Sequence, residues 1–176
     1  EHEMAFIACH FPLVSMSNVA AALRGDAELP DGAVAVNFDD GIANNLTTAL
    51  PILERHGVPA TIYVSTGFIG TGRRIWSDTL ENAFLETAAG GLDVTIAGHS
   101  FTFALTTIDQ RVAAFAEVKS RCKLIENAVK DEIVTGVCEA LGVDTISHPL
   151  YEFLDWDQVR ALSRSPLIEI GAHTVD

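Results

Sequence analysis

The chain has 176 residues, of which 48% are apolar, and this size and composition fit one globular domain with a substantial core rather than a disordered chain. Its 24 acidic and 11 basic residues give a formal net charge of −13, which would repel nucleic-acid phosphates and anionic lipid surfaces. Nucleic acid is therefore an unfavourable partner, and no apolar stretch approaches the roughly 18 residues of a membrane-spanning segment. Neutral or cationic substrates remain compatible with this charge.

The beginning of the chain predicts a short helix followed by a strand. The helix is expected over residues 19–24, with Ser17 or Asn18 as its cap. After a Pro-Asp-Gly turn, a β-type apolar run predicts a strand over residues 34–38. Cys9 lies before this helix. The three cysteines are odd in number and far apart, which predicts buried, reduced thiols and leans towards a reducing, cytoplasmic compartment.

A helical pattern of leucines follows this strand, at Leu46, Leu50 and Leu53. Pro51 is unfavourable in a helix interior, so either the helix proper begins near Thr48 or the helix kinks at the proline. A second strand comes next, and the strand, helix and strand together fit within about 30 residues, the size of a βαβ unit.

This second strand is expected over residues 59–64, and it is followed by a Gly- and Thr-rich loop over residues 65–74. Residues 76–150 break the alternation of strand and helix and predict a mostly helical insertion. Helices are expected over 76–89, 108–129 and 132–141, and alternating apolar residues predict one hairpin between the first two helices, over 92–105.

The end of the chain returns to the strand and helix pattern. Pro149 is expected to break the chain before a short helix over residues 156–162. A last strand is expected over residues 167–170, and His173 stands at its exit.

The most informative stretch is residues 34–41, which read Val-Ala-Val-Asn-Phe-Asp-Asp-Gly. Charge at the exit of a buried strand needs a partner, and adjacent residues on an extended segment point to opposite sides. Of Asp39 and Asp40, one can therefore hold a metal while the other faces the reacting group as a base. The alternative is an ordinary strand followed by an Asp-Gly turn.

His173 would reach the same rim as Asp39 and Asp40 if the first and last strands are parallel neighbours. A carboxylate with an imidazole suits a first-row metal such as zinc, nickel or cobalt. A histidine taken alone is more often structural, and two protein ligands are one short of the usual catalytic three.

These two motifs, in this order, resemble the metal-dependent polysaccharide deacetylase family, which includes carbohydrate esterases and nodulation-protein-type deacetylase domains. The family's first signature is Thr-Phe-Asp-Asp-Gly, matched here by Asn-Phe-Asp-Asp-Gly at residues 37–41. Its second is His-Ser/Thr-x-x-x-His or a version one residue shorter, of which His-Thr-Val-Asp stands at residues 173–176. Residues 44–68 and 155–173 resemble the segments that follow the first motif and precede the second.

The resemblance implies an α/β fold that is part of a distorted (β/α) barrel. It also implies a hydrolase that removes N-acetyl groups from amino sugars of a polysaccharide or glycolipid, using a divalent metal such as zinc. Asp39 would be the general base, Asp40 the metal-binding aspartate and His173 the first metal-binding histidine. The metal would lower the pKa of its bound water and polarise the acetamide carbonyl.

The sequence also differs from the family's pattern at some positions. Asn37 stands where the family has Thr or Ser, a position that can orient the carboxylates. The second metal-binding histidine would follow Asp176, so residues 1–176 are expected to be a single deacetylase-like domain, incomplete at both ends, with residues 76–150 inserted in it. Two alternatives stay open: a truncated or degenerate carbohydrate-binding domain without turnover, and a relative that hydrolyses cyclic amides.

Overall fold

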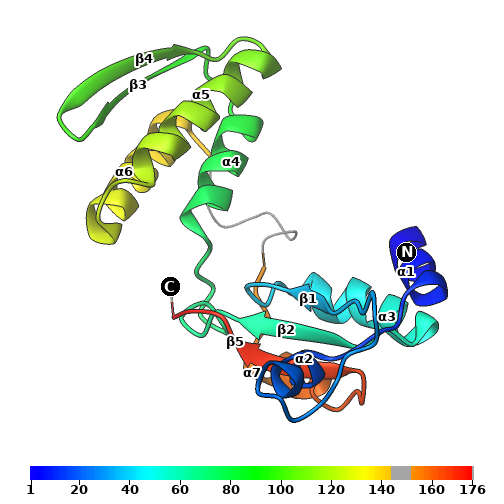
Figure 1. The fold of residues 1–176 in the computed structure, drawn as a ribbon. Helices are drawn as coiled ribbons and strands as arrows, with labels where there is room; N and C mark the ends of the chain where they lie inside the picture. Colours follow the sequence, from blue (N-terminus) through cyan, green and yellow to red (C-terminus); the bar gives the residue numbers. More distant parts are fainter. Residues whose placement is uncertain (144–151, 176) are drawn as a thin grey trace. The chain divides into compact units, whose positions relative to one another are not determined.

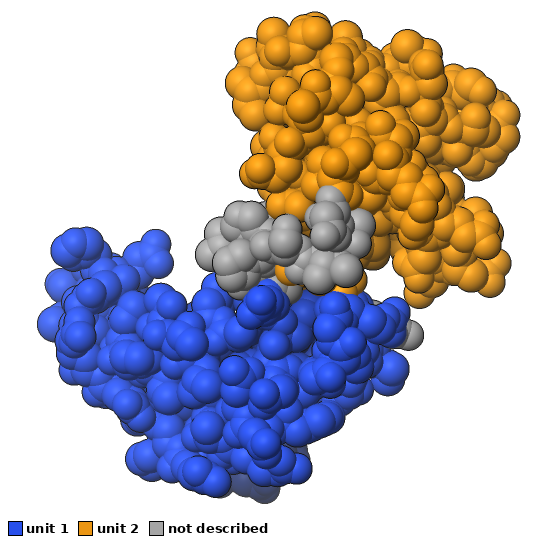
Figure 2. All heavy atoms as spheres, turned by 180° about the vertical axis from the view of Figure 1, so that it is seen from behind, with its two compact units in different colours: residues 1–73, 150–176 blue, residues 74–149 orange. Residues whose placement is uncertain are grey.

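The computed structural model describes residues 1–143 and 152–175, and the chain divides into two compact units. Unit 1 contains residues 1–73 and 150–176, and unit 2 contains residues 74–149 (Figure 2). The chain break expected at Pro149 lies outside the described residues.

Unit 1 is built on a parallel sheet that has the strand order β1-β2-β5 in the described part of the chain (Figure 1). The strands are β1 (Val36–Phe38), β2 (Ala60–Val64) and β5 (Ile168–Ala172). Ala60 lies between Val36 of β1 and Ile168 of β5. The predicted parallel pairing of the three strands is confirmed, and the fold is of the mixed α/β class. The expected barrel is not seen, because the sheet formed by the described residues is open.

The two faces of this sheet differ in polarity because successive strand residues point to opposite sides. Apolar residues of one face, including Phe38 and Ile62, enter a hydrophobic core with residues of the surrounding helices, among them Leu53 and Leu162. Those helices are α1 (His2–His10), α3 (Leu50–His56) and α7 (Trp156–Leu162). Helix α2 (Met16–Leu23) contributes no residue to this core and lies at the polar face, where its Ser17 N–H donates to Glu169 of β5.

Helix α2 begins three residues earlier than the sequence predicted, because its cap is Ser15. The Ser15 hydroxyl accepts a hydrogen bond from the Asn18 backbone N–H, and the Asn18 side chain accepts one from the Ser15 N–H. This reciprocal capping box satisfies two amides at the start of the helix. The expected caps, Ser17 and Asn18, therefore lie inside the helix.

Pro51 lies in the first turn of α3, where its fixed φ and missing N–H are tolerated. A π-helical segment, η1 (Asn45–Ala49), precedes it, and in this wider turn the Leu50 N–H donates to the carbonyl of Asn45. The helix proper thus begins near the proline, as the first of the two alternatives predicted. Gly57 ends α3 with a φ of 63°.

Unit 2 contains a hairpin and three helices among its described residues. They are α4 (Trp76–Glu86), β3 (Gly91–Ile96), β4 (His99–Ala104), α5 (Ile108–Cys122) and α6 (Asn127–Leu141). The antiparallel pairing confirms the predicted hairpin, which closes through Ala97 and Gly98 with φ values of 50° and 80°. Positive φ at both central residues is typical of a tight two-residue hairpin turn.

The helices of unit 2 enclose a hydrophobic core of their own, which includes Phe84, Val118 and Val137. Cys122 and Cys138 belong to this core, as predicted, and burial raises the pKa of both thiols. The prediction for Cys9 was wrong, because this cysteine is exposed on α1. Within the described ranges, no helix is both long enough and apolar enough to span a membrane.

Candidate functional site

The two adjacent carboxylates lie immediately after β1, in a tight turn. The Gly41 N–H donates to the carbonyl of Asp39 at 2.9 Å, an i to i+2 bond that makes Asp40 the central residue of a γ-turn. The φ angles of Asp40 and Gly41 are 67° and 80°. A positive φ at a residue other than glycine costs energy and persists only where surrounding contacts hold it.

Three contacts hold this turn in place. The Ser65 N–H, just after β2, donates to the carbonyl of Asp40 at 3.2 Å, and the Leu154 N–H donates to the carbonyl of Gly41 at 2.9 Å. Gly41 is packed so closely that a Cβ on it would lie 3.0 Å from Cγ1 of Val64. The motif glycine is therefore required both for its φ and for the space it leaves.

The structure brings Asp40 and His173 together at the carboxyl ends of the strands. His173 follows β5, and its N–H donates to the carbonyl of Val64 at 3.0 Å. Its Nδ1 lies 3.5 Å from Oδ1 of Asp40, and the two side chains are 38% and 33% exposed. A carboxylate and an imidazole ring thus share one partly exposed position, as expected for strand exits that meet at the same rim.

Asp39 has a different environment from its neighbour. It is exposed, and its side chain makes no hydrogen bond or ion pair with another described residue. The carboxylate of Asp39 is therefore open to solvent, while that of Asp40 faces His173.

Ser65 belongs to this site, although the sequence analysis did not single it out. It is 2% exposed, and its Oγ lies 3.3 Å from Oδ1 of Asp40 and 3.4 Å from Nδ1 of His173. Oγ1 of Thr174 lies 3.4 Å from the same oxygen. The sequence feature that could have identified Ser65 is its position directly after β2, the strand that lies between β1 and β5.

Asp40 and His173 fit part of a metal site. One carboxylate and one imidazole are donors that zinc accepts, and both are accessible from solvent. No group of three or more His, Cys, Asp or Glu side chains suited to a metal occurs within the described residues. A third protein ligand would therefore have to come from outside the described residues.

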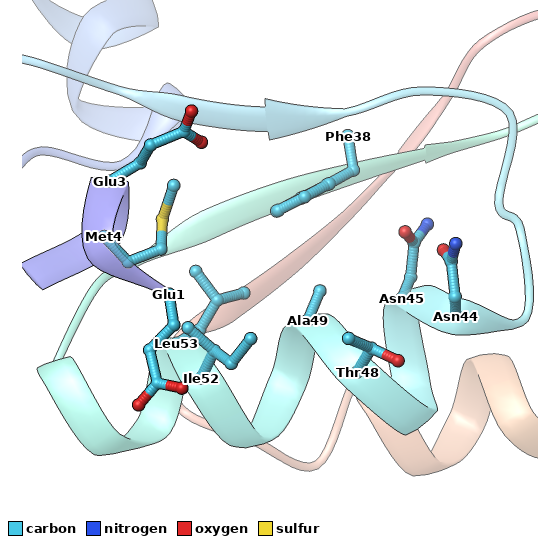
Figure 3. Close-up of a pocket in the computed structure, with 10 residues that line it drawn as sticks. All are labelled: Glu1, Glu3, Met4, Phe38, Asn44, Asn45, Thr48, Ala49, Ile52 and Leu53. Atoms are coloured by element: carbon cyan, nitrogen blue, oxygen red, sulfur yellow. The ribbon is translucent and has the colours of Figure 1, made fainter.

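Two concave surfaces of unit 1 lie away from this pair. One, of about 360 Å³, is lined by residues of α1, β1, η1 and α3, including Phe38 and Leu53 (Figure 3). Asn45 also lines it and is 4% exposed, and its amide nitrogen has no hydrogen-bond partner among the described residues. Neither Asp40 nor His173 lines this pocket.

The second concave surface, of about 490 Å³, contains Glu169 on β5 and the start of α2. Oε2 of Glu169 accepts hydrogen bonds from the Ser17 N–H at 3.1 Å and from the Thr61 hydroxyl at 3.3 Å. Partial burial raises the pKa of Glu169, but the hydrogen bonds from Ser15, Ser17 and Thr61 together outweigh it and leave that pKa below its usual value. This carboxylate attaches the N-terminus of α2 to the polar face of the sheet.

Comparison with known proteins places the chain in a family. The family model described as polysaccharide deacetylase matches residues 26–176, a range that includes both motifs, and the chain belongs to this family. None of the curated proteins compared with the chain matches it.

Two solved structures are similar to the chain. The BpsB deacetylase domain from Bordetella bronchiseptica is 18% identical with a TM-score of 0.48, and the match covers 99% of this chain and 43% of that one. A de-N-acetylase from Aggregatibacter actinomycetemcomitans is 20% identical with a TM-score of 0.46, and the match covers 99% of this chain and 42% of that one. The chain thus spans less than half the length of either structure.

Proposed function

We propose that this chain carries part of the active site of a metal-dependent de-N-acetylase that hydrolyses acetamide groups on the amino sugars of a polysaccharide or glycolipid. Membership in the polysaccharide deacetylase family supports the reaction class. The observation that carries the proposal is the 3.5 Å approach of Asp40 to His173 at the carboxyl ends of parallel strands. These are the positions at which α/β folds assemble their sites.

In this proposal Asp40 and His173 hold a divalent ion through a carboxylate oxygen and an imidazole nitrogen, and zinc is the preferred ion with nickel or cobalt as alternatives. When bound, such an ion supplies an activated water and polarises the acetamide carbonyl. The Asp39 carboxylate, exposed and without an ion-pair partner among the described residues, takes the proton from the attacking water.

The charge of the chain is compatible with an acetylated amino sugar as the substrate. Such a sugar is neutral, so the net charge of −13 does not oppose its binding. Hydrolysis of the acetamide yields acetate, which the negative field repels, and an ammonium group.

Release of acetate from N-acetylglucosamine oligomers by a chain with a histidine added after position 176, with and without added zinc, tests this function. We expect zinc-dependent release that Asp39→Asn and Asp40→Ala both remove, with zinc binding retained only in Asp39→Asn. Release unaffected by either substitution would refute the roles of both residues. Oligomer binding without acetate release would favour a carbohydrate-binding domain. Hydrolysis of a cyclic amide, without acetate release from the sugar, would favour a cyclic-amide hydrolase.

A further inference from the structure

Ser65 occupies the space between the two proposed metal ligands and contacts both. Its side chain is buried, whereas Asp40 and His173 are each about one-third exposed. The Ser65 hydroxyl therefore contacts Asp40 and His173 from the protein interior, while the other side of both residues faces solvent. Its backbone N–H also binds the carbonyl of Asp40, so the same residue fixes both the main chain and the side chain of this aspartate.

The hydrogen-bonding capacity of a hydroxyl matches its three neighbours. A serine hydroxyl has one proton to donate and two lone pairs that accept. A carboxylate can only accept, so the Ser65 hydroxyl donates to Asp40. Its two lone pairs are then left to accept, from the Thr174 hydroxyl and, where the imidazole carries its proton on Nδ1, from that N–H of His173. In this arrangement the neutral imidazole carries its proton on Nδ1, and its lone pair is on Nε2.

We infer that Ser65 is a positioning residue of the proposed metal site: it holds the Asp40 carboxylate and fixes the His173 ring in its Nδ1–H tautomer. The inference rests on the proposed function and names the side chain that orients its ligands. Hydrogen-bonding partners behind metal ligands commonly fix ring tautomer and orientation in this way. The present O···O and O···N distances of 3.3 and 3.4 Å are long, and such bonds tighten when the ligands engage.

The position of Asn37 strengthens this assignment. Asn37 replaces the Thr or Ser of the first motif, and it is exposed with no side-chain hydrogen bond to another described residue. In this chain the hydroxyl that touches the metal-binding aspartate therefore comes from the neighbouring strand, at Ser65.

Zinc titration of the full 176-residue chain, monitored by NMR so that weak binding can be measured, tests the inference. Loss of a hydrogen-bonding partner behind a metal ligand typically weakens metal binding by about 10- to 100-fold, and we expect Ser65→Ala to fall within this range. Ser65→Thr keeps a hydroxyl and should recover most of the affinity. Thr66→Ala is the matched control, because Thr66 is the exposed neighbour and its hydroxyl makes no hydrogen bond with another described residue.

The ring of His173 gives a second readout that needs no metal. We expect long-range proton–nitrogen spectra of the zinc-free wild type to report a proton on Nδ1, and those of Ser65→Ala to report a mixture of tautomers. Thermal unfolding of each variant confirms that it is folded.

The outcomes separate this inference from the proposed function. Ser65→Ala with wild-type zinc affinity and an unchanged His173 spectrum, in a chain where Asp40→Ala loses zinc, overturns the role of Ser65 and leaves the metal site standing. Equal zinc affinity in the wild type and Asp40→Ala overturns the metal site and, with it, this inference.

Discussion

Replacing Gly41 by alanine should destabilise unit 1 for two separate reasons. The first is backbone strain, since Gly41 has a φ of 80° and a residue with a Cβ in this region costs about 1 to 2 kcal/mol. The second is packing, since the new methyl would lie 3.0 Å from Cγ1 of Val64 and 3.2 Å from Cδ1 of Ile69. Overpacking of this kind costs about 1 to 3 kcal/mol. The sum is a loss of roughly 2 to 5 kcal/mol in the free energy of unfolding.

The chain contains a matched control for the backbone part. Gly25 has a φ of 81°, and a Cβ built on it would meet nothing within 4 Å. Gly25→Ala therefore carries the strain without the clash, and the difference between the two variants should be about 1 to 3 kcal/mol. Urea unfolding followed by fluorescence of Trp156, in a Trp76→Phe background, reports on unit 1 because Trp76 belongs to unit 2.

Equal losses for Gly41→Ala and Gly25→Ala would refute the packing argument and leave only the strain. A double-mutant cycle with Val64→Ala gives an independent check, because removing the Val64 methyls should relieve part of the clash. We expect a favourable coupling of about 0.5 to 3 kcal/mol, the range for residues in contact. A coupling near zero would show that Ile69 or the backbone takes up the strain instead.

Three further predictions concern the sheet and the metal. The pKa of Glu169 is lowered, so its carboxylate stabilises the fold above its unfolded pKa and loses this effect as the pH falls through its folded pKa. The gap in urea midpoint between wild type and Glu169→Gln should therefore narrow on acidification below about pH 4.3, and a constant gap would contradict this. Gly171→Ala would place a methyl 2.5 Å from Cδ1 of Tyr63 and should lower the free energy of unfolding by about 1 to 3 kcal/mol. In a Tyr63→Ala background the same substitution should cost less, and equal costs in the two backgrounds, measured by urea unfolding, would contradict the contact. In a chain with a histidine added after position 176, calorimetry should show tighter zinc binding than in the 176-residue chain. Asp40→Ala should abolish this binding, whereas Asp39→Ala should preserve it and remove acetate release.

The sheet and the meeting of its strand exits could be predicted because both follow from local patterns. A short apolar run before Asp39 and another before His173 predict buried strands, and the intervening helix predicts parallel pairing. Parallel strands place their carboxyl ends at one edge, so the approach of Asp40 to His173 needed no knowledge of the register. The distance between them, however, depends on the turn at Asp40. An Asp-Gly pair favours the positive φ seen there, but the pair alone does not determine how closely Asp40 approaches His173.

The details that the sequence did not predict depend on contacts between distant segments or on competition between equivalent residues. Ser15, Ser17 and Asn18 are all good helix caps, and the choice of Ser15 leaves the Ser17 N–H for Glu169 on a strand far along the chain. Cys9 is exposed because it lies on α1, a helix with no fully buried residue, so the rule that free cysteines are buried fails there.

The role of Ser65 follows from the way the turn after β1 is held. The strained backbone of Asp40 persists because β2 supplies the Ser65 N–H to its carbonyl and the side chain of Val64 beneath Gly41. The Ser65 hydroxyl, on the same residue, then reaches the Asp40 carboxylate and the His173 ring. Since His173 is itself aligned by its N–H bond to Val64, the end of β2 sets the positions of both motifs. A substitution at Val64 or Ser65 is therefore expected to disturb the two motifs together.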